Sequence, residues 1–235
     1  MQDLKERYLS VKKSVADAAI SAGRRAEDVT VLAAVKYATA EEINFLHREC
    51  GLCHIGENRV QHLLEHYDAL EDKENISIHF IGSLQKNKVK YVVGKVCLIH
   101  SLDSLSLAAE IEKQSAKRGI VTDVLVEINC GREAQKGGVM PEDAADFCLA
   151  LSSLAHVRLR GFMTMAPKCE KKEEYFNYFQ ETSQLVLDIW QEKLHNIYKP
   201  VLSMGMSASV VPAIEAGADC VRVGSAIFGR TTPLK

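Results

Sequence analysis

The stretch Val31-Leu-Ala-Ala-Val-Lys36 shows how this chain is built. Its five apolar residues follow one another without polar alternation, which is typical of a strand buried on both faces of a parallel sheet. Shortly afterwards Thr39 is a suitable helix N-cap, and Glu41 and Glu42 place carboxylates in the first helical turn, where they favour the helix dipole. The stretch therefore predicts a buried strand that leads through a short loop into a helix.

The same succession of apolar run, loop and helical stretch recurs along the chain. Seven further runs are strand candidates, at Cys53–Gly56, Ile76–Ile81, Val96–His100, Val124–Ile128, Val157–Phe162, Val201–Met204 and Cys220–Val223. Strands that alternate with helices predict a parallel sheet, and eight strands are the number that closes into a barrel. No linker or low-complexity segment interrupts the pattern, so we expect residues 1–235 to form one α/β domain, a single (β/α)8 TIM barrel.

An additional helix precedes the first strand. Apolar side chains recur at the helical period from Leu4 to Ala19, and Gly23 ends the pattern. About a dozen residues follow the eighth strand, which leaves room there for only a short helix. We therefore expect the extra N-terminal helix to occupy the open place in the outer ring.

Composition excludes several classes of protein. Of the 235 residues, 47% are hydrophobic, and the net charge of −2 comes from mixed acids and bases, unlike a nucleic-acid-binding protein. The start of the chain is charged, and no apolar run approaches the roughly 20 residues of a membrane span, so we expect neither a signal peptide nor a membrane segment. The charged cluster Lys168–Glu174 is interpreted as a solvated loop.

The cysteines favour a cytoplasmic location. There are seven, an odd number, and most have apolar neighbours, which is typical of reduced thiols in a cytosolic protein. Cys50 and Cys53 form a C-x-x-C pair, but a zinc site needs a second ligand pair and a redox site needs a lowered thiol pKa. We therefore assign this pair no chemical role.

Lys36 is the sharpest candidate for chemistry, because the active face of such barrels is the carboxyl end of the strands. Its apolar predecessors predict a stem that leaves a buried strand and an amine held away from water, which disfavours the ammonium form. A neutral amine forms a Schiff base with an aldehyde. The alternative is a lysine that extends to solvent at a strand end, and position alone favours that alternative.

Two loops at the same face have the chemistry of an anion site. Gly205-Met206-Ser207 follows the seventh run and leads into a helix, and Gly224-Ser225 repeats the arrangement after the eighth. Free backbone N–H groups, two hydroxyls and the close approach that Gly224 permits suit a phosphate, and loops seven and eight are the usual phosphate corner of this architecture. The alternative is ordinary helix capping by the two serines.

Three more polar residues lie near this mouth. Arg222 stands within the apolar eighth run, where a cation is costly without a partner. It either closes a salt bridge inside the barrel or presents its guanidinium to a ring nitrogen. Asn58 follows the second run, and His79 lies within the third, so a hydrogen-bonded core histidine is at least as well supported there as a ligand contact.

Six groups of residues carry a resemblance to a known family: Ile55–Gln61, His79–Gly82 with Leu84-Gln85 and Asn87-Lys88, Gln135–Gly138, Arg160-Gly161 with Met163–Pro167, Leu202–Ser207, and Val221–Gly229. From about Val31 to Arg230 the chain resembles the pyridoxal phosphate homeostasis proteins, the barrel relatives of the alanine racemase N-terminal domain. The resemblance implies pyridoxal 5′-phosphate (PLP) as the cofactor, bound covalently to Lys36. It implies a phosphate site at Ser207, Gly224 and Ser225, with Arg222 facing the pyridine nitrogen.

The resemblance also implies that Asn58 and His79 line the pocket. Position and resemblance together give the expected cofactor-binding residues as Lys36, Asn58, His79, Met206, Ser207, Arg222, Gly224 and Ser225. The family implies a monomer that takes part in vitamin B6 homeostasis, has no established catalysis and delivers cofactor to apo-enzymes. This sequence departs from the family pattern at Tyr37, Ser209 and Ser225, where a small residue, Asp and Thr are usual.

An amino-acid racemase is the alternative function. A two-base racemase needs an acid or base on each face of its substrate. Alanine racemases take the second one from a further domain and a partner subunit, for which a chain ending at Lys235 leaves no room. Tyr37 follows Lys36 directly, and in a strand its side chain would point the opposite way. We therefore expect a binding protein and not an enzyme. A thiol-based redox or scaffold protein is a third class. In that case the purified protein would be colourless, because it would carry no PLP.

Overall fold

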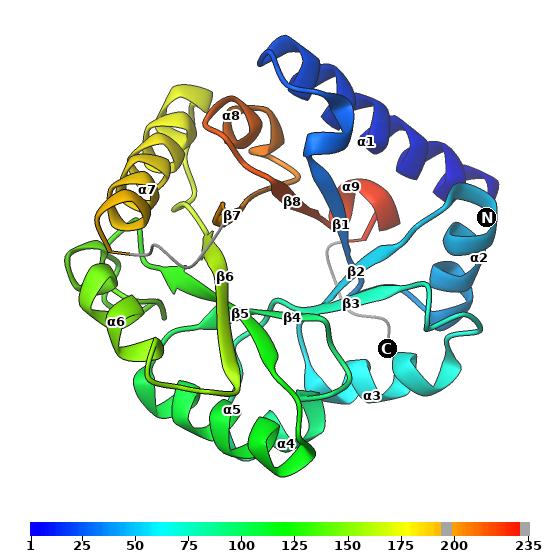
Figure 1. Cartoon of the computed structure of the whole chain (residues 1–235). Helices are drawn as coiled ribbons and strands as arrows, with labels where there is room; N and C mark the ends of the chain where they lie inside the picture. The colour runs from blue at the N-terminus through cyan, green and yellow to red at the C-terminus, as the bar shows by residue number, and fades with distance from the viewer. Residues whose placement is uncertain (194–198, 231–235) are drawn as a thin grey trace.

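The computed structural model describes residues 1–193 and 199–230. It contains a closed barrel of eight parallel strands in sequence order, seen end-on in Figure 1. The strands are β1 (Thr30–Ala34), β2 (His54–Glu57), β3 (Ser77–Phe80), β4 (Leu98–Leu102), β5 (Thr122–Ile128), β6 (Val157–Thr164), β7 (Val201–Met206) and β8 (Cys220–Val223). The first and last strands close the barrel, with Thr30 opposite Cys220 and Ala33 opposite Val223. The predicted (β/α)8 barrel is confirmed.

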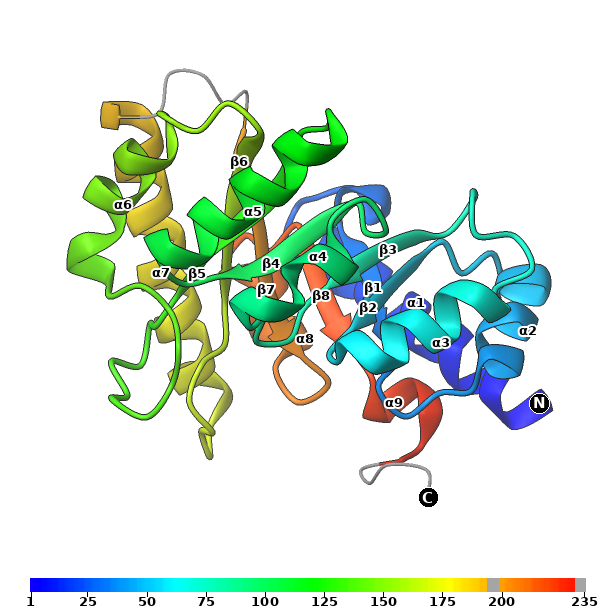
Figure 2. The same ribbon diagram turned by 90° about the horizontal axis from the view of Figure 1, so that it is seen from below.

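The helices form a ring around these strands. They are α1 (Gln2–Ser21), α2 (Ala40–Cys50), α3 (Val60–Ala69), α4 (Val89–Val92), α5 (Leu105–Arg118), α6 (Ala144–Leu151), α7 (Lys172–Lys193), α8 (Val210–Glu215) and α9 (Ser225–Phe228), with 3-10 turns at Ala26–Asp28, Lys86–Lys88 and Pro141–Asp143. Helix α1 contacts α2, α8 and α9, and it fills the place between α2 and α8 in the ring (Figure 1). The prediction for the N-terminal helix is therefore confirmed. The short α9 lies beyond the carboxyl end of β8 (Figure 2).

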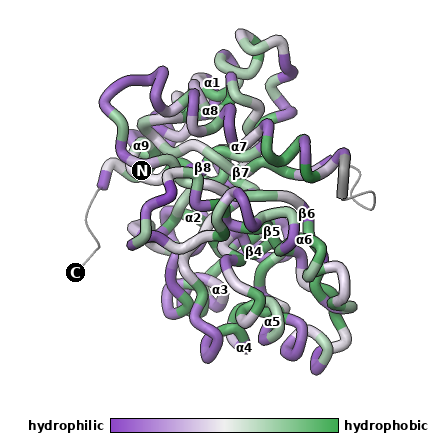
Figure 3. The backbone as a smooth tube through the Cα atoms, turned by 90° about the vertical axis from the view of Figure 1, so that its left-hand side faces the viewer, coloured by the Kyte–Doolittle hydropathy of each residue, from purple (hydrophilic) through white to green (hydrophobic). Residues whose placement is uncertain are grey.

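Buried side chains form two layers, one between the strands and the helices and one inside the barrel. Hydrophobic residues dominate the central strands, while the helices alternate between hydrophobic and hydrophilic residues (Figure 3). The larger apolar cluster lies between strands and helices. Inside the barrel the apolar cluster is small, formed by Leu32, Ile81 and Cys220, and polar side chains such as His100 and Arg222 are also buried. The barrel interior is therefore more polar than the layers of Val, Ile and Leu that usually fill such barrels.

The charged cluster Lys168–Glu174 is only in part a loop, because α7 begins at Lys172. The side chain of Glu174 accepts hydrogen bonds from the backbone N–H groups of Glu170 (3.1 Å) and Lys171 (3.4 Å). Glu173 and Glu174 also lie in the first turn, where carboxylates favour the helix dipole. The same charges that suggested solvation thus start a helix.

All seven cysteines are free thiols. Burial raises the pKa of Cys50, and it raises the pKa of Cys148 to about 12, so neither thiol readily forms a thiolate.

Within residues 1–193 and 199–230, no helix combines the length and the apolar character that crossing a bilayer demands.

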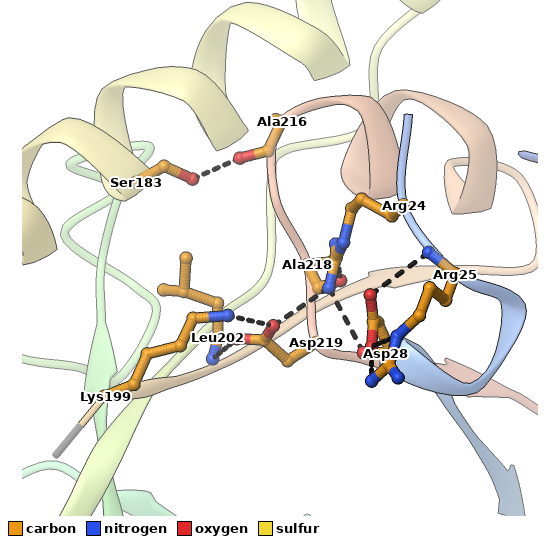
Figure 4. A network of polar contacts seen from close by, with 9 residues as sticks. All are labelled: Arg24, Arg25, Asp28, Ser183, Lys199, Leu202, Ala216, Ala218 and Asp219. Atoms are coloured by element: carbon orange, nitrogen blue, oxygen red, sulfur yellow. Dashed lines mark hydrogen bonds and ion pairs between the residues drawn. The ribbon is translucent and has the colours of Figure 1, made fainter. Parts of the chain in front are cut away.

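A polar cluster around Asp219 joins the end of α1 to the last two strands (Figure 4). The Asp219 carboxylate accepts hydrogen bonds from Arg24 (3.0 Å), Lys199 (2.9 Å) and the backbone N–H of Leu202 (3.0 Å). Arg24 also donates to the carbonyl of Ala218 at 2.5 Å. The carboxylate side chain is only 16% exposed, so these contacts are well shielded from water.

Replacing Asp219 with alanine is expected to lower the free energy of unfolding by about 2–3 kcal/mol, because a shielded arginine loses its charged partner. Urea denaturation measures this directly. Asp17→Ala is the matched control, since Asp17 is 59% exposed and pairs with Lys13 on the surface of α1. An Asp219 variant as stable as the Asp17 variant would contradict the assigned role.

Candidate functional site

A cavity of about 360 Å³ opens at the carboxyl ends of the strands. Its volume falls within the usual range for small-molecule sites. Seven of the eight predicted site residues line it, namely Lys36, Asn58, Met206, Ser207, Arg222, Gly224 and Ser225. The remaining lining residues are Ala34, Tyr37, Ile81, Met165, Ala208 and Arg230. The barrel thus brings together side chains from both halves of the chain.

Lys36 lies in a turn and not at the end of a strand. Strand β1 ends at Ala34, and the N–H of Ala38 donates to the carbonyl of Val35 at 2.9 Å, which places Lys36 and Tyr37 at the two central positions of the turn. The Lys36 amine lies 4.6 Å from the centroid of the Tyr37 ring. The prediction that Tyr37 points away from Lys36 is therefore wrong, because side chains alternate in a strand but not in a turn.

Lys36 is also exposed, which contradicts the prediction of an amine shielded from water. Its predecessors Val35 and Ala33 are fully buried, so the apolar run is in the core as expected. The turn carries the next side chain out of that core to the cavity mouth. Lys36 is therefore reachable from solvent at the cavity mouth.

Arg230 holds this turn in place. Its guanidinium donates to the carbonyl of Tyr37 (2.9 Å) and to both carboxylate oxygens of Glu42 (2.9 and 2.7 Å). Glu42 in turn closes the capping box of α2 by accepting from the N–H of Thr39 at 2.9 Å. Arg230 was not predicted. A cation directly after the eighth-strand motif is the one sequence signal that could have indicated it.

The two predicted phosphate loops meet at one corner of the cavity. The hydroxyl of Ser225 donates to that of Ser207 at 3.2 Å. Within the described part of the chain, the backbone N–H groups of Ser207, Ala208, Ser225 and Ala226 donate to no protein acceptor. These donors and two hydroxyls form a neutral cradle for an anion.

Gly224 lets β1 approach this corner closely. A Cβ atom added at Gly224 would lie 3.0 Å from the carbonyl oxygen of Ala34, which is tighter than ordinary contact. Ser209 is not among the residues that line the cavity, and its side chain forms no capping hydrogen bond with α8. Its hydroxyl accepts from the N–H of Met206 at 3.1 Å and so shapes the loop that carries Ser207.

Arg222 lies in the floor of the cavity and is 5% exposed. Its Nη1 donates to the carbonyl (2.7 Å) and hydroxyl (2.8 Å) oxygens of Ser203, and its Nη2 donates to the carbonyl of Thr164 (2.8 Å). No carboxylate among the described residues forms an ion pair with it, so the salt-bridge interpretation is wrong. Burial lowers the pKa of Arg222 from its ordinary value, yet an arginine stays charged.

Asn58 lines the cavity from the loop after β2. Its side-chain oxygen Oδ1 is buried and has no hydrogen-bond partner within the described residues. A buried polar atom without a partner is uncommon in proteins and is often explained by a ligand or water. Gly82 packs against the Asn58 backbone so closely that any side chain at position 82 would collide with it.

His79 is the one predicted site residue that does not line the cavity. It is 8% exposed, and its two ring nitrogens contact His54 (3.2 Å) and His100 (3.0 Å). Because β3 turns this side chain toward the barrel interior below the mouth, the structure favours the core-histidine interpretation.

The electrostatics of the cavity favour an anionic ligand. Lys36, Arg222 and Arg230 line it, and no aspartate or glutamate is among its lining residues. The arrangement therefore combines a reachable primary amine, a donor-rich corner suited to phosphate, and a buried cation in the floor.

Comparisons with known proteins agree with this geometry. A profile of the family described as alanine racemase, N-terminal domain, matches residues 21–232. The pyridoxal phosphate homeostasis protein of Aquifex aeolicus is 43% identical over 224 residues, covering 95% of this chain and 96% of that protein. The chain belongs to the pyridoxal phosphate homeostasis protein family.

Two solved structures have the same barrel. A protein of unknown function from Bifidobacterium adolescentis superposes with a TM-score of 0.90 at 31% identity, covering 97% of this chain and 95% of that one. PipY of Synechococcus elongatus, solved with PLP bound, superposes with a TM-score of 0.83 at 27% identity, covering 96% of this chain and all of PipY. The family resemblance seen in the sequence is thereby confirmed.

Proposed function

We propose that this chain binds PLP in the cavity, as a Schiff base with Lys36, and acts in PLP homeostasis without catalysis of its own. The observation that carries the proposal is that a primary amine and a corner of free N–H and hydroxyl donors line one electropositive cavity. The names of the curated relatives and the PLP-bound PipY structure support it. We further propose that residues 1–235 act as one cytoplasmic, monomeric domain that passes cofactor to apo-enzymes.

Each group has a definite part in holding the cofactor. PLP supplies an aldehyde for the Lys36 amine and a phosphate dianion for the corner formed by Ser207 and Ser225. Gly224 keeps that corner open. Three of the five N–H bonds of Arg222 are used by Ser203 and Thr164, and the two that remain are available to a ring nitrogen. Asn58 offers its unpartnered oxygen.

A racemase is the second candidate, because Tyr37 lines the same cavity as Lys36. Two-base chemistry needs groups on opposite faces of a flat ligand. The Lys36 amine and the Tyr37 ring contact each other, so they approach a ligand from one side. A cation held against the ring nitrogen also makes PLP a poor electron sink. Both points favour the binding protein.

The deciding experiment is borohydride reduction of the protein after incubation with PLP, followed by peptide mass analysis. We expect a visible absorption band before reduction and one labelled peptide, the one that contains Lys36. A label on any other lysine would refute the site.

Racemase and transaminase assays with common amino acids should give no turnover above PLP alone, and turnover that Lys36→Ala abolishes would establish the enzyme instead.

Replacing Ser225 with aspartate is expected to weaken PLP binding by about 100-fold or more, because a carboxylate in the corner repels the phosphate dianion. Fluorescence titration measures the affinity. Ser225→Thr keeps the hydroxyl and should bind within about threefold of the natural protein. Equal affinities for the two variants would place the phosphate elsewhere.

A further inference from the structure

Two buried histidines, His79 and His100, and the partly exposed His54 form a continuous hydrogen-bonded row in the barrel interior, which we call the histidine chain. Nδ1 of His54 lies 3.2 Å from Nε2 of His79, and Nδ1 of His79 lies 3.0 Å from Nε2 of His100. Nδ1 of His100 lies 3.0 Å from the hydroxyl of Ser203, which accepts from Arg222 at 2.8 Å. The row therefore runs from β2 through β3 and β4, crosses the barrel to β7, and ends on the cation in the cavity floor.

The direction of these hydrogen bonds follows from Arg222, which can only donate. The Ser203 oxygen accepts from Arg222, and its own proton is then best donated to Nδ1 of His100. His100 must in turn donate from Nε2 to His79, and His79 from Nε2 to His54. The last N–H, on partly exposed His54, can reach solvent.

The opposite direction is less favourable. Among the described residues it would leave the Ser203 proton with no acceptor but the thiol of Cys220, which accepts weakly. It would also aim every N–H dipole at the guanidinium. All three rings are expected to be neutral. Burial and then the neighbouring His54 lower the pKa of His79 to about 3, and burial, His79 and Arg222 lower that of His100.

We propose that His54, His79 and His100 are positioning residues that order the Ser203 hydroxyl and so hold the Arg222 guanidinium toward the ring nitrogen of the cofactor. The proposal rests on the proposed function for the identity of its ligand. The histidine chain, however, exists in the protein without any ligand. Ser203 is the only side-chain partner of Arg222 among the described residues, its other partners being carbonyls. The rotation of that hydroxyl is therefore what the histidine chain can set.

The first test uses the protein without PLP. Nitrogen NMR of histidine-labelled protein at neutral pH should show all three rings as Nε2–H tautomers, with Nδ1 unprotonated. Ser203→Ala should remove the donor to His100 and shift its Nδ1 signal, whereas Ser101→Ala should leave it unchanged. Ser101 is a matched control because it is buried in the same strand as His100 and its hydroxyl has no partner within the described residues. An Nδ1–H tautomer or a protonated ring at His79 or His100 would overturn the proposal.

The second test uses the PLP-loaded protein. Ser203→Ala should lower PLP affinity by about tenfold, the effect of one charge-assisted hydrogen bond, and should shift the cofactor absorption spectrum in the direction that Arg222→Gln shifts it. Ser203→Thr, which keeps the hydroxyl, should restore both. A spectrum altered by Arg222→Gln but not by Ser203→Ala would show that the histidine chain only fills space. Failure of the natural protein to bind PLP would refute the proposed function and leave the tautomer result standing.

Discussion

Replacing Lys36 with alanine is expected to abolish covalent retention of PLP and to weaken equilibrium binding by about 100-fold, or about 2.8 kcal/mol. The Schiff base is lost, while the donor corner at Ser207 and Ser225 and the floor at Arg222 remain. Binding should therefore be weak but measurable. Because Lys36 is exposed in a turn, the free energy of unfolding should change by less than about 0.5 kcal/mol.

Two further variants separate charge from covalent chemistry. Lys36→Arg keeps a cation over the Tyr37 ring but cannot form the Schiff base, so it should behave like the alanine variant after borohydride reduction. Lys12→Ala is the matched control, because Lys12 lies over the ring of Tyr8 in the same manner, at 5.8 Å, yet outside the cavity. It should retain PLP fully. Covalent retention by Lys36→Arg would show that another amine carries the cofactor.

The fold and most of the site could be predicted because both depend on local signals. Strands buried on both faces are continuous apolar runs, and such a run is visible in Val31–Val35 without knowledge of its partners. Closing the barrel brings the carboxyl ends of all strands to one mouth. That is why Ser207 and Ser225, 18 residues apart in the sequence, were predicted to share a corner and are in hydrogen-bond contact.

The features that escaped prediction depend on local geometry or on distant partners. An apolar run does not show where its strand ends, so nothing in the sequence indicated that a turn begins at Val35 and places Tyr37 beside Lys36. Arg230 acts through Glu42, which lies 188 residues away. His79 has apolar neighbours whether it meets a ligand or another histidine, and only the interior of the closed barrel decides between the two.

The burial of His79 and His100 also predicts that the free energy of unfolding decreases strongly in acid. His79, with a pKa of about 3, and His100, whose pKa burial lowers well below its ordinary value, stay neutral in the folded protein while their unfolded counterparts take up protons below about pH 6.5. Unfolding then binds protons, so stability is present above this pH and is lost as the pH falls. Each histidine should cost about 1.4 kcal/mol per pH unit.

Glu127 acts in the opposite direction. Burial, and then the nearby Asp103, raise its pKa to about 6, so the folded protein gains a proton there that the unfolded chain binds only near pH 4.3. This offsets about one histidine, and the net loss between pH 6.5 and 4.5 should be about 3 kcal/mol. Urea denaturation at half-unit pH steps measures the slope. Glu127→Gln should steepen it about 1.5-fold, and a flat profile over this range would mean that the histidine chain is protonated in the folded protein.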